Sequence, residues 1–222
     1  MKIVAVESIG ISPLKAVEIA KHFAAHGHEF VFYPDRKEDQ TSLLERMHDA
    51  DIAIISNIPL PETVLSKCKN LKFIALAFTG MDHIDVNYCQ KQGIVIRNAA
   101  GYATHAVSEL TIGLILDVYR HLSEMENQTR LLRTRNNFIG REIYGKTVGI
   151  IGTGAIGRCT ALLLKHFGCN VIVYSRTQHN AMIENQIPYV SLNELLLQSD
   201  IVSLHLALTP ETTHLISKEK LA

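Results

Sequence analysis

Short apolar runs alternate with longer amphipathic stretches over the first hundred residues of the chain. Apolar runs of about four to eight residues predict strands, whereas apolar positions three and four apart predict helices. A helical stretch follows each predicted strand, which is the pattern of a parallel sheet covered on both faces. The sequence therefore predicts a flavodoxin-like α/β unit over residues 1–98. Its predicted strands are residues 2–7, 29–34, 51–57, 71–78 and 94–100.

The first predicted helix has clear start and stop signals. Ser12 precedes it as a candidate N-cap, Pro13 takes its first position and Gly27 follows as a stop. Further helices are predicted over residues 41–50 and 61–70, and another after the turn that ends in His83.

A longer helix is predicted over residues 106–132, which contain no proline and only one glycine, Gly113. Its first half is apolar nearly all round, which predicts burial. Its second half places Val118, Leu122 and Met125 at helical spacing, with charged residues between them. Two interpretations are equally compatible with this pattern: a helix that bridges two domains or forms a subunit interface, and one core helix.

The remaining sequence predicts a second α/β unit over residues 99–222, after a polar loop at 133–146. Its last predicted strand is continuously apolar, which favours burial on both faces, and a helix is predicted to start after it. A doubly wound dinucleotide-binding domain has six strands in the order 3-2-1-4-5-6. Only four strands are found, so we expect an incomplete Rossmann domain, truncated after its fourth strand. The four are residues 147–152, 170–175, 188–190 and 200–208.

Composition and charge narrow the functional classes. Hydrophobic residues make up 47% of the chain, and the 22 basic residues equal the 22 acidic ones in number. This balance provides no net electrostatic field that would favour binding to nucleic acid or to a membrane surface. No apolar run is long enough for a membrane span. The four cysteines form no CxxC pair, and with the eleven histidines they show no zinc spacing. We therefore expect reduced thiols, no metal site and a cytoplasmic protein.

The candidate chemistry begins with a glycine motif between a predicted strand and a predicted helix. Gly152 permits a tight turn, Gly154 lets a pyrophosphate approach the backbone, and Gly157 lets helix and strand pack closely. Ala155 and Ile156 begin the helix, whose free N–H groups and dipole favour phosphate. A glycine-rich turn without a ligand is the alternative, but strand, turn, helix and second strand all fall in register.

The end of the second strand bears on the choice of dinucleotide. An acidic residue there accepts hydrogen bonds from the adenosine ribose and repels a 2′-phosphate. This chain instead has Ser175, Arg176 and Thr177, whose hydroxyls and guanidinium suit a phosphate. The charge argument favours NADP over NAD, and the alternative is that Arg176 is a solvated loop residue.

Three stretches resemble the D-isomer-specific 2-hydroxyacid dehydrogenases, a family that includes phosphoglycerate dehydrogenases and glyoxylate/hydroxypyruvate reductases. Residues 71–116 are similar to the end of that family's first domain and its crossing into the cofactor domain. Residues 141–157 resemble its glycine stretch, and residues 200–216 resemble its "Dvvs-H-Plt-eT-hli" stretch. The resemblance implies hydride transfer between NAD(P)H and a small 2-keto or 2-hydroxy acid, in a protein that is usually a homodimer.

The resemblance also implies residue roles. The substrate-binding positions are Asn57, Thr79, Gly80 and Met81, with the carboxylate facing the backbone N–H groups of 79–81. Besides Thr79, the glycine turn and 175–177, the implied cofactor positions are Thr104, Val107, His205, Leu206, Ala207 and Thr213. The chain departs from the family pattern at Ala207, where proline is usual, at Ser108, and in lacking a tryptophan before the glycine strand.

Several of these residues have simpler interpretations. His205 can be a hydrogen-bonded core histidine, and Thr79 can serve only to shape a turn. Glu109 lies in an apolar helix, so we expect it to be paired and structural. His83 and His105 are expected near the cleft, as incidental residues rather than catalytic ones.

The family's catalytic arginine, glutamate and histidine belong to motifs that do not occur in this sequence. We therefore expect no catalytic residue here, a C-terminally truncated copy and little activity of this chain alone. The alternative is a degenerate nucleotide-binding module with a sensing or scaffolding role.

Overall fold

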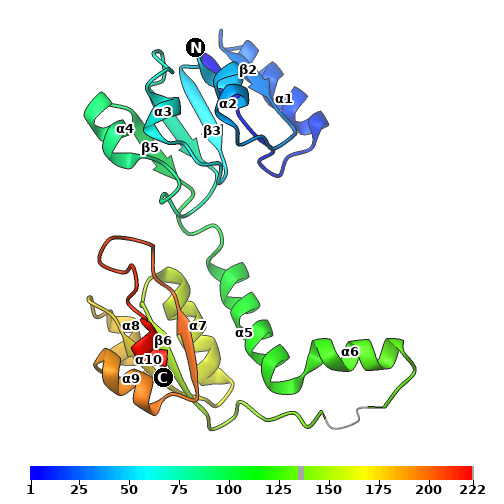
Figure 1. Cartoon of the computed structure of the whole chain (residues 1–222), viewed down its shortest axis with the longest axis vertical. Helices are drawn as coiled ribbons and strands as arrows, with labels where there is room; N and C mark the ends of the chain where they lie inside the picture. The colour runs from blue at the N-terminus through cyan, green and yellow to red at the C-terminus, as the bar shows by residue number, and fades with distance from the viewer. Residues whose placement is uncertain (135–137, 222) are drawn as a thin grey trace. The chain divides into compact units, whose positions relative to one another are not determined.

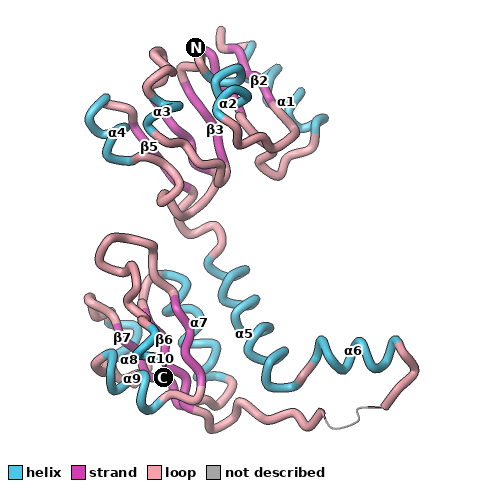
Figure 2. Tube along the Cα trace, in the orientation of Figure 1, coloured by secondary structure: helices cyan, strands magenta, loops and turns pink. Residues whose placement is uncertain are grey.

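The computed structural model describes residues 1–134 and 138–221. It divides into two compact units, Met1–Ala100 and Gly101–Ala222, each built on its own parallel sheet (Figure 1, Figure 2). The two units are described separately.

The first unit is a five-stranded sheet with helices between its strands. All neighbouring strands are parallel, and their order is β2-β1-β3-β4-β5, the order of flavodoxin-like sheets. This confirms the α/β prediction for the first hundred residues. The strands are β1 (Lys2–Ala5), β2 (Glu29–Phe32), β3 (Ile52–Ile55), β4 (Phe73–Leu76) and β5 (Val95–Asn98). The helices are α1 (Pro13–Ala24), α2 (Gln40–Met47), α3 (Glu62–Leu65) and α4 (Val86–Gln92).

The start signal of α1 is confirmed, because the Ser12 hydroxyl accepts a hydrogen bond from the Lys15 N–H at 3.2 Å. Asp39 and Asp85 cap α2 and α4 in the same way. The core of the unit consists of the inner face of the sheet and the helix faces that cover it. Its largest fully buried side chains are Leu43, Met47, Ile55, Ile58, Leu60, Leu65 and Ile74.

The second unit has a three-stranded parallel sheet in the order β7-β6-β8. Helix α7 connects β6 to β7, and α5 packs against α7. The strands are β6 (Thr147–Ile151), β7 (Asn170–Tyr174) and β8 (Ile201–Leu204). The helices are α5 (Thr104–Arg120), α6 (Leu122–Arg130), α7 (Ala155–His166), α8 (Asn180–Glu184), α9 (Leu192–Gln198) and α10 (Lys218–Leu221).

The prediction of one helix over 106–132 is wrong. His121, with φ 55° and ψ 43°, is left-handed and separates α5 from α6. The Asp117 carboxylate accepts hydrogen bonds from the Ser123 N–H and hydroxyl, which holds the break. The expected burial of the first half is also wrong, because Leu110 is 60% exposed, Leu114 57% and Val118 72%. Apolar residues all round a helix do not show which side the fold will cover.

Three further expectations in this unit need correction. Residues 188–190 form no strand, since Tyr189 makes only an isolated bridge to Val173. The last strand is shorter than 200–208, and Val202 and Leu204 are exposed, because β8 pairs with β6 alone among the described residues. Residues 210–216 form turns and a bend, and α10 begins only at Lys218. The hydroxyls of Thr212 and Thr213 hydrogen-bond to backbone carbonyl oxygens there, which competes with helix formation.

The loop predicted at 133–146 includes residues 135–137, which lie outside the described residues, as does Ala222. Within the described ranges, no helix is long and apolar enough to cross a bilayer. The same ranges contain no group of three or more acidic, histidine or cysteine side chains arranged to bind a metal ion.

Candidate functional site: a dinucleotide-binding turn

A glycine turn connects β6 to the first residue of α7. Gly152 has a φ of 98°, and a β-carbon there would collide with the carbonyl oxygen of His205. A β-carbon on Gly157 would overlap the carbonyl oxygen of Gly152, whereas one on Gly154 would meet nothing within 4 Å. Two glycines therefore bring strand, turn and helix together, and the third leaves open space for a group from outside. The tight turn at Gly152 and the close packing at Gly157 are as expected, and the pyrophosphate role of Gly154 stays a prediction.

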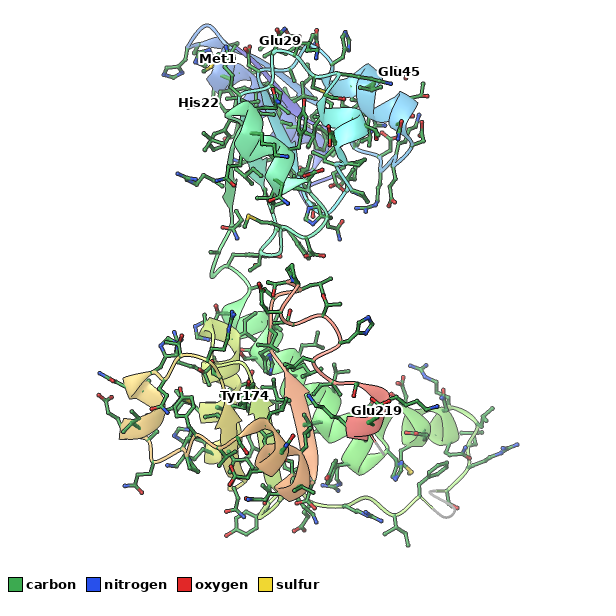
Figure 3. The ribbon with its side chains drawn as sticks, turned by 60° about the vertical axis from the view of Figure 1, so that its left-hand side comes forward. Met1, His22, Glu29, Glu45, Tyr174 and Glu219 are labelled. Carbon is green, nitrogen blue, oxygen red and sulfur yellow. The ribbon has the colours of Figure 1, made fainter. Side chains whose placement is uncertain are left out.

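A cavity of about 310 Å³ opens beside this turn, at the carboxyl ends of the strands. It brings together eight residues expected from the sequence: Gly152, Gly154, Ser175, Arg176, Thr177, His205, Leu206 and Ala207. Six lining residues were missed: Thr153, Tyr174, His179, Glu211, Thr212 and Leu215. Of these, Tyr174 ends β7 (Figure 3) and follows directly from the strand prediction, whereas the residues from 211 onward come from the turn segment that was predicted as a helix.

Hydrogen bonds hold the segment after β7 beside the glycine turn. The Thr153 hydroxyl donates to the Thr177 carbonyl oxygen at 3.3 Å. The Tyr189 hydroxyl donates to Thr153 Oγ1 at 3.2 Å and accepts from the His179 N–H at 2.9 Å. Thr153 is buried, so these bonds satisfy a hydroxyl that would otherwise be costly to bury. The backbone that follows Ser175 and Arg176 is therefore held beside the glycine turn, and all three residues 175–177 line the cavity.

His205 forms another part of the wall. Its Nε2 lies 3.0 Å from Ser203 Oγ, and burial lowers the pKa of its imidazole. A second groove of about 350 Å³ lies between α5 and β8 and is lined by both Val107 and His205. His205 thus lines both the cavity and the groove.

The other expected cofactor positions of this unit do not line the cavity; they are Thr104, Val107, Ala155, Ile156, Gly157 and Thr213. Ala155 and Ile156 form the first turn of α7. The Ser108 hydroxyl donates to the carbonyl oxygens of Thr104 and Ile156, at 2.8 and 3.2 Å, and so ties the start of α5 to α7. Thr213 is exposed, and its hydroxyl donates to the Thr209 carbonyl oxygen at 2.7 Å.

The expected substrate positions belong to the first unit, at the carboxyl ends of β3 and β4. Thr79, Gly80 and Met81 follow β4, and the Asn98 side-chain amide donates to the Thr79 carbonyl oxygen at 2.7 Å. This hydrogen bond fixes one end of a loop whose N–H groups are the expected carboxylate ligands. Asn57 follows β3, and its Oδ1 accepts a hydrogen bond from Arg36.

A buried carboxylate supports the loop that carries Asn57. Glu7 is only 2% exposed, and its Oε1 accepts the backbone N–H groups of Ser56, Asn57 and Ile58 at 2.7, 3.1 and 3.1 Å. Its Oε2 accepts from Arg36 Nη1 at 2.8 Å. The carboxyl ends of β1 and β3 meet here, at the switch point where flavodoxin-like folds bind ligands. In this chain, the carboxylate of Glu7 occupies that switch point.

The residues with simpler interpretations take different environments. Glu109 is exposed, so its carboxylate carries no burial cost that a partner would have to offset. His83 is partly buried against Phe78, and burial lowers its pKa although Asp82 acts in the opposite direction. His105 is exposed, with its Nδ1 3.9 Å from the Cys159 sulfur. None of these positions by itself assigns a catalytic role.

Comparison with known sequences agrees with this geometry. The sequence model described as "D-isomer specific 2-hydroxyacid dehydrogenase, NAD binding domain" matches residues 112–222, half of the chain. The chain belongs to the D-isomer-specific 2-hydroxyacid dehydrogenase family. The resemblance inferred from the sequence is therefore confirmed, and the glycine turn and its cavity lie in the part that matches the family's NAD-binding domain.

Relatives in the family extend the match to the whole chain. Hydroxypyruvate reductase of Blautia hydrogenotrophica is 32% identical over 209 residues, which are 91% of this chain and 65% of that protein. The D-lactate dehydrogenase of Aquifex aeolicus, solved with NAD and lactic acid, aligns with a TM-score of 0.83 at 29% identity, covering 100% of this chain and 65% of that one. An acyclic imino acid reductase solved with NADPH and D-Arg gives 0.86 at 25% identity, covering 100% and 70%. The chain thus spans about two thirds of these proteins.

Proposed function

We propose that this chain provides the cofactor platform and the substrate-carboxylate loop of an oxidoreductase that transfers hydride between NAD(P)H and a small 2-keto or 2-hydroxy acid. The single observation that carries the proposal is the glycine turn. Gly152 and Gly157 cannot accept a β-carbon, while Gly154 faces open space at the start of α7 beside the cavity. A dinucleotide pyrophosphate needs this combination of backbone approach and free helix N–H groups.

Each group of residues has a separate task in this proposal. The backbone at Gly154, Ala155 and Ile156 binds the pyrophosphate, and 175–177 hold the adenosine ribose end. Thr104, Val107 and the segment 205–207 shape the nicotinamide side, and Thr213 supports the turn near it. The N–H groups of Thr79, Gly80 and Met81 bind the substrate carboxylate, with Asn57 beside them. The nicotinamide, when bound, supplies or accepts the hydride.

For the cofactor we propose a preference for NADP over NAD. Ser175, Arg176 and Thr177 all line the cavity and offer two hydroxyls and a guanidinium to a 2′-phosphate. Fluorescence titration with NADPH and with NADH tests this preference, and Arg176→Gln should weaken NADPH binding far more than NADH binding. A clear preference of the wild-type chain for NADH would contradict it.

We further propose that these 222 residues bind the dinucleotide but do not turn over a keto acid. No residue of this sequence matches the family's catalytic arginine, glutamate or histidine motifs. The test measures the loss of NADPH absorbance when the purified chain is mixed with hydroxypyruvate or glyoxylate. Reduction of either keto acid would overturn the proposal that the chain has no turnover. The alternative is a nucleotide-binding module with a sensing or scaffolding role. If the chain bound neither NADH nor NADPH, the sensing role would be excluded.

For the assembly we propose a cytoplasmic homodimer formed through α5 and α6. Leu110, Leu114 and Val118 follow one another at intervals of four residues along α5, and Leu122 begins α6 after the break; each of the four is at least half exposed. None of the residues of α6 is buried. Such an apolar stripe is typical of a helix that packs against a partner. Light scattering should give the mass of a dimer for the wild type and of a monomer for Leu114→Glu/Val118→Glu. Leu14→Glu, on the equally exposed surface of α1, should leave the dimer intact.

A further inference from the structure

The cavity at the glycine turn contains one carboxylate that the proposed cofactor chemistry does not explain. Glu211 lines the same cavity as Arg176, although the two residues come from different segments, one after β8 and the other after β7. Both side chains are exposed to the cavity and to solvent. The acidic residue that many dinucleotide-binding domains have at the end of the second strand is missing here, and Ser175 and Arg176 take its place.

The Glu211 carboxylate is held in position rather than free on a loop. Its Oε2 accepts a hydrogen bond from the Thr209 hydroxyl at 2.7 Å. The Thr209 N–H donates to Thr212 Oγ1 at 2.8 Å, and the Thr212 hydroxyl lies 2.7 Å from the Ala207 carbonyl oxygen. These bonds tie the turn to the segment that leaves β8. The carboxylate therefore has a fixed place at the rim of the cavity.

The two charges act on one another. The hydrogen bond from Thr209 is the main reason that the pKa of Glu211 lies below its ordinary value, and the positive charge of Arg176 lowers it further. Glu211 is thus ionised at neutral pH and offsets part of the field that Arg176 presents to an anion. A phosphate that enters the cavity meets both charges, because both residues line it and charges act on one another over about a Debye length, roughly 10 Å at 0.1 M salt.

We infer that Glu211 is a specificity-determining residue that opposes Arg176 in the cavity. It accepts hydrogen bonds from the ribose hydroxyls of NAD(H) and repels the 2′-phosphate of NADP(H). The inference rests on the proposed cofactor function and deepens it. The preference for NADP over NAD is then smaller than Arg176 alone would give, because the cation that attracts the 2′-phosphate and the anion that repels it line the same cavity. The acidic function that is absent after β7 is supplied from the turn after β8.

Isothermal titration calorimetry of the whole chain with NADP⁺ and with NAD⁺ tests the inference. Glu211→Gln keeps the shape and an acceptor but removes the charge. The ratio of the NAD⁺ dissociation constant to that of NADP⁺ should rise about three- to tenfold at low salt, and the rise should shrink at high salt. Glu142→Gln is the matched control, since Glu142 is also exposed but lies before β6, at the other end of the strand from the glycine turn.

The outcomes separate the inference from the proposal beneath it. An unchanged ratio in Glu211→Gln, together with a reduced NADP⁺ affinity in Arg176→Gln, overturns the role of Glu211 and leaves the NADP preference standing. An unchanged ratio in Arg176→Gln overturns the NADP preference itself. An equal rise of the ratio in Glu142→Gln and Glu211→Gln would show that the effect comes from the net charge of the chain, and it overturns the inference. Failure of the wild-type chain to bind either dinucleotide overturns both.

Discussion

Gly157 lies so close to Gly152 that a β-carbon on the helix residue would overlap the carbonyl oxygen of the strand residue. The contact joins the end of β6 to the first turn of α7. It is backbone against backbone, so no side-chain rotation can relieve an added methyl group. The position of the helix N-terminus, and with it the proposed phosphate site, depends on this one approach.

Gly157→Ala should therefore destabilise the second unit and abolish dinucleotide binding. Overpacking of this kind costs about 1–3 kcal/mol, and here it also pushes α7 away from the turn. Thermal unfolding and calorimetry with NADP⁺ measure the two effects. Gly113→Ala is the control: an added β-carbon in α5 meets nothing within 4 Å, so this variant should be as stable as the wild type or more so. Wild-type affinity in Gly157→Ala would refute the role of the contact.

Glu7→Ala should loosen the loop at the end of β3. The Ser56, Asn57 and Ile58 N–H groups would lose their acceptor, at a cost of about 3 kcal/mol to the first unit. Amide hydrogen exchange at these three residues should accelerate with the fall in stability. Glu38→Ala removes an exposed partner of Arg36 instead and should cost less than about 1 kcal/mol. Equal effects of the two substitutions would show that burial of the carboxylate does not matter.

Acidification should weaken the second unit through His205. Burial lowers the pKa of His205 from the ordinary 6.5, so below pH 6.5 the unfolded chain takes up a proton that the folded chain does not. The associated stability is complete above pH 6.5 and is lost as the pH falls from there to the folded pKa. His205→Gln should reduce the dependence of the second unit's stability on pH in this range. Hydrogen exchange of the β6 amides measures that stability. The control is His26→Gln, since His26 is exposed and belongs to the other unit. If stability depended on pH in His205→Gln as it does in the wild type, His205 would not be the group responsible.

Thiol reagents should distinguish one cysteine from the other three. Cys68, Cys89 and Cys169 are buried, and burial raises the pKa of each thiol, that of Cys68 to about 11. Cys159 is partly exposed on α7. One thiol should react rapidly in the native chain and all four in denaturant, because the thiolate is the reactive form. Cys159→Ser should remove the fast reaction, and a persistent fast phase would contradict the burial of the others.

Local patterns were enough to predict the layered fold. Alternation of apolar strands and helices indicated two parallel α/β units, because β-strand and helix periods differ and each unit must cover both sheet faces. The glycine spacing indicated the dinucleotide turn, since only glycine tolerates the backbone approaches at Gly152 and Gly157. Five of the cavity residues followed from local signals: Gly152, Gly154, Ser175, Arg176 and Thr177. His205, Leu206 and Ala207 followed from the family resemblance instead.

Tertiary structure decided what local patterns leave open. The break at His121 and the exposure of Leu114 depend on which face of a helix is covered, and an all-round apolar sequence does not contain that information. Glu211 joins Arg176 at one cavity, and Glu7 joins Ser56 and Arg36 in another cluster, although each set is scattered along the chain. Only the close packing of strand ends brings such residues within hydrogen-bonding or electrostatic range, so their partnership is a property of the fold rather than of any segment.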